Sequence, residues 1–117
     1  MKKGESTMSQ YLIVLRDANW NPESLSPEEL QAIMKKYRTW IDGIAGKGNK
    51  LRDKEGRVVR RNGSGVSVTD GPYSEAKEVI GGYIVIEADS YEDAVKKCED
   101  SPHLVNGSIE IRALEVR

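Results

Sequence analysis

Cysteine and histidine are almost absent from this chain of 117 residues, which has one of each, Cys98 and His103. A single cysteine cannot form a disulfide within the chain, and one cysteine with one histidine makes a poor set of zinc ligands. The sequence therefore indicates no metal site and no cofactor. A reducing cytoplasm is the simplest compartment for such a chain.

The chain also lacks a charge excess of either sign and a long apolar run. Its 18 basic residues stand against 19 acidic ones, for a formal net charge of −1. General nucleic-acid binding needs a strong basic excess, so it is disfavoured. No stretch approaches the roughly 20 apolar residues of a membrane-spanning helix. We expect neither nucleic acid nor a membrane as a direct partner.

What is present describes one soluble globular domain, with 38% hydrophobic and 32% charged residues. A chain of this length can build a two-layer core but has no room for a second one. Residues 1–9 are polar, have no apolar segment of the kind found in signal peptides, and are expected to form a flexible leader. Residues 10–117 are expected to form the domain.

Short apolar strands alternate with two amphipathic helices. Three runs are rich in strand-forming side chains, at residues 11–15, 83–88 and 108–113. A helix is predicted after Ser26, which can cap it, with Pro27 in the first position and Glu29 completing a capping box. A second helix is predicted after Ser90. Between them, the Asn-Gly-Ser-Gly sequence at residues 62–65 predicts a hairpin turn.

This order of elements predicts an α+β fold of the ferredoxin-like type. Two helices can cover only one face of a four-stranded antiparallel sheet. The other face, with Leu12 and Val14, would remain apolar and exposed, which usually marks an interface. We expect a homodimer with its sheets face to face around a partly polar chamber, lined in part by Glu110 and Arg112.

Asp70 is a candidate functional carboxylate. It stands at the end of the hairpin, before a stiff turn in which Gly71 can adopt positive φ and Pro72 fixes its own φ. Such a turn suits a positioned catalytic group. The alternative is that Asp70 only hydrogen-bonds the turn amides, as aspartate often does.

Three other features have both a functional and a structural interpretation. Trp40 flanks the apolar stripe of the first helix and either edges a pocket or belongs to the core. Residues 50–61 are locally basic, and they form either a solvated hairpin arm or an edge from which Arg60 or Arg61 faces an acidic ligand. Cys98 falls on the buried stripe of the second helix, so its thiol is expected to be inert.

An ordered series of motifs resembles the YCII-related family, in its branch with a DGPF motif. The motifs are Asp70-Gly71-Pro72-Tyr73, Glu75, Lys77-Glu78, Gly81-Gly82-Tyr83 and the Ser-Ile-Glu-Ile-Arg sequence at residues 108–112. The resemblance extends from Tyr11 to Leu114. It implies a ferredoxin-like fold assembled as a dimeric α/β barrel, in a family of mostly small bacterial cytoplasmic proteins of unsettled biochemistry.

The resemblance also implies functions and site residues. Some members of the wider superfamily act on small cyclic or chlorinated acids, as lactone dehalogenases do, with a proposed His-Asp pair. Some DGPF-type proteins are encoded with, or fused to, extracytoplasmic-function sigma factors. Asp70 matches the motif aspartate, Tyr73 replaces its phenylalanine, and Glu75 and Glu78 match the acidic positions that follow. His103 resembles a position of this branch, whereas shorter members have their histidine nearer the first helix.

We therefore expect a dimeric protein that binds a small organic acid, with Asp70 and His103 as an acid/base pair. An unperturbed histidine titrates near pH 6.5, so His103 could abstract a proton beside a carbonyl while Asp70 orients its ring. Arg112 or Arg60 would bind the substrate carboxylate. The remaining ligand-binding candidates are Trp40, Tyr73, Tyr83, Glu78 and Glu110.

Three alternatives remain open at the level of the sequence. His103 can be a surface histidine in a loop. The protein can be a non-catalytic ligand-binding module, linked to sigma-factor-dependent transcription, that holds its ligand with Trp40, Tyr73 and Tyr83. It can also be a dimeric scaffold in which the turn at Asp70 is purely structural.

Overall fold

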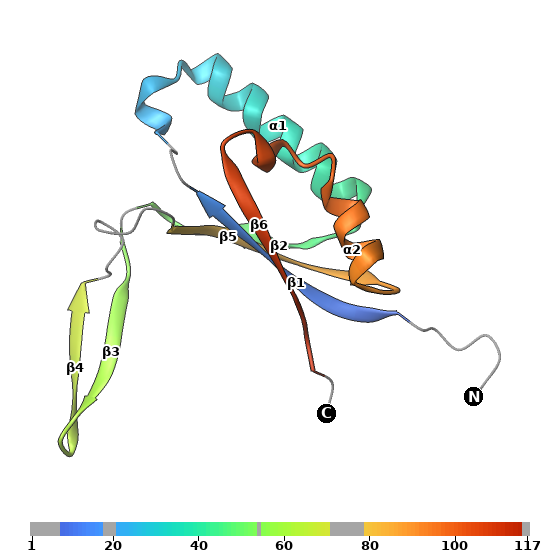
Figure 1. Cartoon of the computed structure of the whole chain (residues 1–117). Coiled ribbons are helices and arrows are strands. Elements are labelled where there is room, and N and C mark those ends of the chain that lie inside the picture. Colours follow the sequence, from blue (N-terminus) through green and yellow to red (C-terminus); the bar gives the residue numbers. More distant parts are fainter. Residues whose placement is uncertain (1–7, 18–20, 54, 71–78, 116–117) are drawn as a thin grey trace, which may run out of the picture.

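A computed structural model describes residues 8–17, 21–53, 55–70 and 79–115 (Figure 1). Both predicted helices and all the predicted strands are present. The elements are β1 (Ser9–Asp17), η1 (Pro22–Ser24), α1 (Pro27–Gly43), β2 (Lys47–Lys50), β3 (Arg57–Asn62), β4 (Gly65–Asp70), β5 (Val79–Ala88), α2 (Tyr91–Cys98), η3 (Pro102–Val105) and β6 (Gly107–Ala113).

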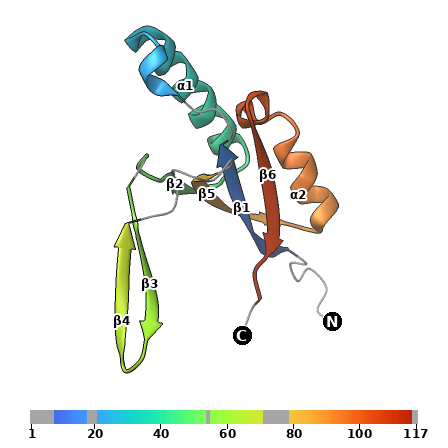
Figure 2. The same cartoon turned by 60° about the vertical axis from the view of Figure 1, so that its left-hand side comes forward.

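The main sheet has four strands in the order β2-β5-β1-β6. Strand β1, one of the two central strands, pairs antiparallel with β5 on one side and with β6 on the other. Helices α1 and α2 both lie over the same face (Figures 1 and 2). Two β-α-β units thus share one antiparallel sheet, so the predicted ferredoxin-like α+β fold is confirmed.

The fourth strand comes from Lys47–Lys50, a segment that carries no apolar alternation. Gly48 allows β2 to approach β5, because a Cβ at this position would overlap the backbone carbonyl oxygen of Tyr83. The predicted hairpin is present as β3 and β4, but these strands form a separate two-stranded sheet. That hairpin projects away from the helices and the main sheet (Figure 2).

The core lies between the helices and the sheet. Alternate residues of β1 and β5 point toward the helices, and Ile13, Ile84 and Ile86 are almost completely buried. Cys98 joins this core from α2, and burial raises the pKa of its thiol to about 11. The expectation that Cys98 lies on a buried stripe is confirmed, and the raised pKa means that the thiol keeps its proton near neutral pH.

The opposite face of the sheet carries no helix. Leu12 and Val14 of β1 lie beside Val85 and Tyr83 of β5 on this face, as their pairing shows. Polar residues flank them: the Glu110 carboxylate accepts hydrogen bonds from Arg16 Nη2 at 2.9 Å and from Arg112 Nη1 at 3.3 Å. The helix-free face is therefore an apolar strip beside a charged cluster.

Replacing Ser26 with alanine is expected to lower the free energy of unfolding by about 1 kcal/mol. Ser26 Oγ accepts a hydrogen bond from the Glu29 backbone N–H at 3.1 Å, and Glu29 Oε1 accepts one from the Ser26 N–H at 2.8 Å. This is the predicted capping box. Urea denaturation measures the effect, with Ser64→Ala in the β3–β4 turn as the control. Equal stability of the two variants would contradict the assignment.

Candidate functional site

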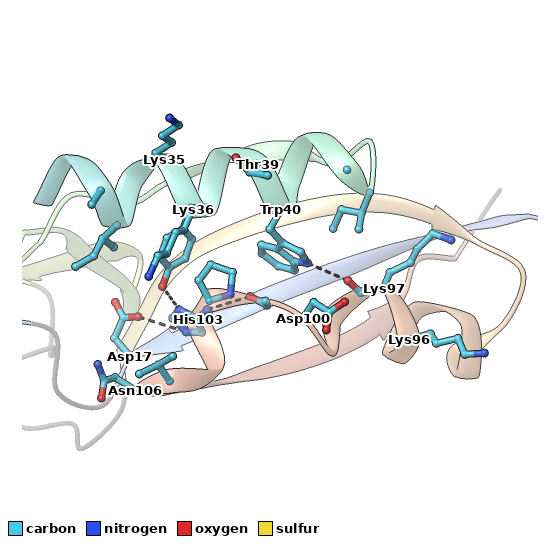
Figure 3. Close-up of a pocket in the computed structure, with 18 residues that line it drawn as sticks. Asp17, Lys35, Lys36, Thr39, Trp40, Lys96, Lys97, Asp100, His103 and Asn106 are labelled. Atoms are coloured by element: carbon cyan, nitrogen blue, oxygen red, sulfur yellow. Dashed lines mark hydrogen bonds and ion pairs between the residues drawn. The ribbon is translucent and has the colours of Figure 1, made fainter. Parts of the chain in front are cut away.

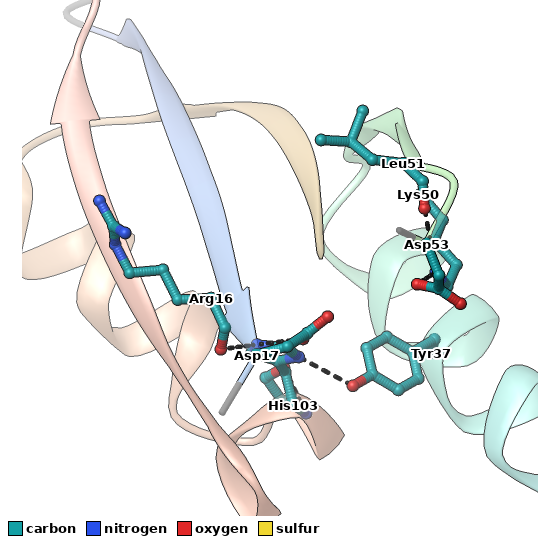
Figure 4. A network of polar contacts seen from close by, with 8 residues as sticks. Arg16, Asp17, Tyr37, Lys50, Leu51, Asp53 and His103 are labelled. Carbon is teal, nitrogen blue, oxygen red and sulfur yellow. Dashed lines mark hydrogen bonds and ion pairs between the residues drawn. The ribbon is translucent and has the colours of Figure 1, made fainter. Parts of the chain in front are cut away.

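His103 lies in η3, the short helix between α2 and β6, and its side chain is only 5% exposed. The interpretation of His103 as a surface histidine is therefore wrong. Ser101 caps this turn, because its Oγ accepts a hydrogen bond from the His103 backbone N–H at 3.1 Å. Pro102 occupies the first helical position. The turn directs the imidazole toward α1 and the end of β1 (Figure 4).

Three groups from two other elements surround the imidazole. Nδ1 lies 2.9 Å from the Tyr37 hydroxyl on α1. Nε2 lies 2.7 Å from the backbone carbonyl oxygen of Arg16 and 3.4 Å from Oδ1 of Asp17, both at the end of β1 (Figure 4). We refer to Asp17, Tyr37 and His103 as the polar cluster.

The partners of His103 fix the position of its proton. The Arg16 carbonyl oxygen can only accept a hydrogen bond, so Nε2 carries the hydrogen that lies between them. In the neutral imidazole Nδ1 is then an acceptor, and the Tyr37 hydroxyl donates to it. Both ring nitrogens are engaged with the protein itself.

Two glycines make room for the polar cluster. The β1–β5 register shifts between Leu15 and Arg16, and the shift leaves Gly81 out of the pairing. A Cβ on Gly81 would overlap the Asp17 carboxylate, and a Cβ on Gly107 would lie 2.6 Å from Nε2 of His103. Both positions therefore require glycine if Asp17 and His103 are to keep these places.

Burial controls the acidity of the cluster. It raises the pKa of the Asp17 carboxyl above its usual value of 3.8, although the charges of His103 and Lys50 oppose the shift. Burial, with a smaller contribution from the charge of Asp17, raises the pKa of Tyr37 to about 12. Near neutral pH Tyr37 thus keeps its proton and acts as a hydrogen-bond donor.

The raised pKa of Asp17 predicts that Asp17→Asn removes a pH-dependent loss of stability. A carboxyl with a higher pKa in the folded chain binds its proton more tightly there than in the unfolded chain. The folded chain therefore loses stability as pH rises from the pKa of the unfolded state through the pKa of the folded state. We expect the free energy of unfolding of the variant, relative to the native chain, to rise between about pH 3 and about pH 7. Denaturant titrations at these pH values measure it, and a relative fall would contradict the prediction.

Two cavities border the polar cluster, and Asp17, Tyr37 and His103 line both of them. The smaller, of about 590 Å³, lies between α1 and the β2–β5 edge of the sheet. The larger, of about 1150 Å³, lies between α1 and the α2–η3 segment (Figure 3). The cluster therefore forms a wall between two spaces in which a ligand could contact it.

Trp40 both belongs to the core and borders a cavity, the two alternatives that the sequence left open for it. Its ring is buried in the core cluster, and it also lines the larger cavity. The indole Nε1 donates a hydrogen bond to the backbone carbonyl oxygen of Lys97 at 2.9 Å, which ties α1 to α2 (Figure 3).

Asp70 is not the carboxylate beside His103. It ends β4 with its side chain 83% exposed, and Oδ1 lies 3.5 Å from Nη1 of Arg57 on β3. The pairing of Asp70 with His103 is therefore corrected: Asp17 occupies that place. The reason is topological, since the β3–β4 hairpin forms its own sheet while β1 ends beside η3. Whether Asp70 or His103 acts in catalysis stays a prediction.

The other predicted residues are dispersed. Tyr83 lines the smaller cavity. Arg60 is exposed on the hairpin, and Glu110 and Arg112 lie on the helix-free face; these three line neither cavity. Tyr73 and Glu78, with Glu75, lie outside the described residues. The polar cluster lies on the helix side of the sheet, so His103 does not line a chamber on the helix-free face.

Asp17 and Tyr37 were not identified as site residues from the sequence. Asp17 has the same alternation phase as Ile13 and Leu15, so it is an acidic residue on the helix-facing side of a strand. That pattern was a usable signal. Tyr37 belongs to the apolar stripe of α1, and nothing in its spacing separates a tyrosine that packs from one that also donates a hydrogen bond.

No group of three or more metal-binding side chains occurs in the described part of the chain. Within the same residues, no helix is long and apolar enough to cross a membrane.

The model of the YCII-related domain matches residues 10–116. The chain belongs to the YCII-related family. The family predicted from the motifs is thus confirmed, although the match does not distinguish the DGPF branch. A search of curated proteins finds no match to this YCII-related protein. All three members of its polar cluster fall inside the matched range.

Proposed function

We propose that this YCII-related protein binds a small organic acid in the smaller cavity and exchanges a proton with it through the polar cluster. One observation carries the proposal: a buried histidine beside a partly buried carboxylate forms part of the wall of a cavity of about 590 Å³. Cavities of this size are typical of small-molecule sites. Asp17 takes the place beside His103 that was predicted for Asp70, and it is also the proposed base, the role that was predicted from the sequence for His103.

The cavity suits an acid with an apolar body. Its apolar lining includes Leu15, Met34 and Ile41. Its charged lining has three cations against two carboxylates, namely Arg38, Lys47 and Lys50 against Asp17 and Asp42. Lys50 is paired with Asp53 at 2.8 Å, so Arg38 and Lys47 are the cations that we expect to bind a carboxylate ligand.

The chemistry is proton abstraction beside a carbonyl. The Asp17 carboxylate takes the proton from that carbon, the electron pair moves onto the carbonyl oxygen, and the enolate accepts a hydrogen bond from Tyr37. Where the enolate is conjugated with a carbon–carbon double bond, return of the proton to the γ-carbon of this dienolate completes an isomerisation that moves the double bond. Departure of a halide with its electron pair instead completes an elimination, with the proton left on Asp17.

Exchange of substrate hydrogen for solvent deuterium tests the proposed reaction. Lactone carboxylates that raise the melting temperature are incubated in deuterated buffer, and exchange beside the carbonyl is followed by NMR. We expect Asp17→Asn to slow exchange by about 10²–10⁴-fold, while Asp70→Asn leaves it unchanged. Acids that bind without exchange in the native protein would refute the catalytic part of the proposal.

A non-catalytic binding module is the second candidate. It is favoured by the burial of His103, whose two ring nitrogens both contact the protein. In this case the same acids bind without turnover and the occupied state is reported to a partner protein. The link to sigma-factor-dependent transcription belongs to this candidate, and it rests on the resemblance to the DGPF branch.

We further propose that the protein is a cytoplasmic homodimer formed through the helix-free face. Support comes from the half-buried side chains of Leu12 and Val85 and from the partly exposed Tyr83, which lie around the buried Val14 on this face. An apolar strip of this kind on a small domain usually marks an interface. Sedimentation velocity at micromolar concentration is expected to show a dimer, and Val85→Glu a monomer. A native protein that sediments as a monomer would contradict this.

A further inference from the structure

The Tyr37 hydroxyl has one proton and two places to donate it. In the neutral cluster it donates to Nδ1 of His103 at 2.9 Å, because Nε2 holds the imidazole hydrogen. Tyr37 also lines both cavities. A ligand that needs a donor from Tyr37 therefore competes with His103 for the same proton.

Protonation of His103 removes this competition. Both nitrogens of an imidazolium are donors, so Nδ1 would donate to Tyr37 Oη and the phenol proton would turn toward the cavity. Nε2 would keep the Arg16 carbonyl oxygen and the nearby Asp17 carboxylate as acceptors. The donors of His103 and Tyr37 then all have acceptors in the protonated, ligand-bound state as well.

We propose that the site takes up one proton from solvent, on His103, together with a ligand whose oxygen accepts a hydrogen bond from Tyr37. The ligand class is a small carboxylate or carbonyl compound. No bond to carbon forms or breaks in this step: the proton moves from water to Nδ1, and the Tyr37 hydrogen rotates from Nδ1 to the ligand oxygen. The proposal rests on the proposed function only for the class of ligand.

The charges that face His103 support this coupling. The Asp17 carboxylate of β1 faces the imidazole, with Oδ1 3.4 Å from Nε2. Beyond it lies Lys50 of β2, whose Nζ donates to Asp53 Oδ1 at 2.8 Å. Tyr37 of α1 is uncharged near neutral pH, and β6 contributes Gly107. With neutral His103, Asp17 presents a negative charge to an anionic ligand, whereas with imidazolium the pair is neutral.

The free protein provides the first test, because His103 is the chain's only histidine. Long-range ¹H–¹⁵N spectra are expected to show the Nε2–H tautomer above the histidine titration and imidazolium below it. The ¹³Cζ resonance of Tyr37, assigned by its loss in Tyr37→Phe, is expected to follow the same titration. An Nδ1–H tautomer, or a Tyr37 resonance that ignores His103, would overturn the proposal.

Calorimetry with benzoate provides the second test. Titrations in buffers of different ionisation enthalpy count the protons taken up, and we expect about one per benzoate above the histidine titration and about none below it. Affinity should rise about tenfold per unit fall in pH above the titration. Tyr37→Phe should weaken both effects and leave only the part that comes from the charge of Asp17, and Asp70→Asn should leave both effects intact.

Benzoate that binds without proton uptake, or does not bind at any pH, would overturn the proposed coupling and ligand class. The outcome is separable from the proposed reaction. Proton-linked binding without hydrogen exchange would refute the catalytic function and leave the coupling in place. Hydrogen exchange without proton-linked binding would refute the coupling and leave the proposed catalytic function in place.

Discussion

Replacing Gly107 with alanine is expected to lower the free energy of unfolding by about 3 kcal/mol, at the upper end of overpacking effects. The added Cβ would overlap the backbone carbonyl oxygen of Arg16 and lie 2.6 Å from Nε2 of His103. Backbone of β1 or β6 must move, since neither atom belongs to a flexible side-chain end. His103 would lose its place beside Asp17, so the variant should also lose proton-linked benzoate binding.

Two other glycines make this prediction specific. Gly43 ends α1 and a Cβ there meets nothing within 4 Å, so Gly43→Ala should not destabilise the fold. The three atoms nearest to a Cβ on Gly81 all belong to the Asp17 carboxyl group, which ends a side chain that can shift. Gly81→Ala should therefore impair the site at a smaller cost in stability than Gly107→Ala. Urea denaturation compares the three, and equal stability of Gly43→Ala and Gly107→Ala would refute the account of Gly107.

Replacing Trp40 with alanine is expected to lower the free energy of unfolding by about 3–5 kcal/mol, the usual cost of truncating a large buried aromatic residue. The ring packs in the core cluster, and its Nε1 hydrogen bond to Lys97 joins the two helices. A domain of this size has only about 5–15 kcal/mol of net stability, so the variant should be marginally folded at 25 °C.

Trp40→Phe separates the packing from the hydrogen bond. It keeps most of the apolar ring and loses the donor to Lys97, so we expect a loss of about 1–2 kcal/mol. Thermal and urea denaturation measure both Trp40 variants. If Trp40→Ala is as stable as the native protein, Trp40 is not part of the core.

Elements with their own sequence signals were predictable. The apolar alternation of residues 83–88 and the Ser26-Pro27 start of α1 each specify structure locally. Strand β2 was not predictable in this way, because Lys47–Lys50 has no apolar pattern. It becomes a strand by pairing with the edge of β5, with Gly48 allowing the approach.

The site was only partly predictable for the same reason. His103 stood out as a rare residue after a helix-breaking proline, and the structure does bury it beside a carboxylate. The partner was misassigned because the sequence does not show that the hairpin ending at Asp70 leaves the main sheet. The only signal in the sequence for the true neighbour, Asp17, is that it falls on the same face of β1 as the buried residues Ile13 and Leu15. Contacts between the end of β1, α1 and η3 depend on tertiary packing.

Titration of the single imidazole in three proteins tests the central claim, that the chemistry of this molecule is centred on His103 and Asp17. The native protein, Asp17→Asn and Asp70→Asn are followed by NMR across the histidine titration. An imidazolium that loses a carboxylate 3.4 Å away is less stable, so Asp17→Asn should move the midpoint to lower pH, and Asp70→Asn should not move it. A midpoint that responds to Asp70→Asn and ignores Asp17→Asn would contradict the account.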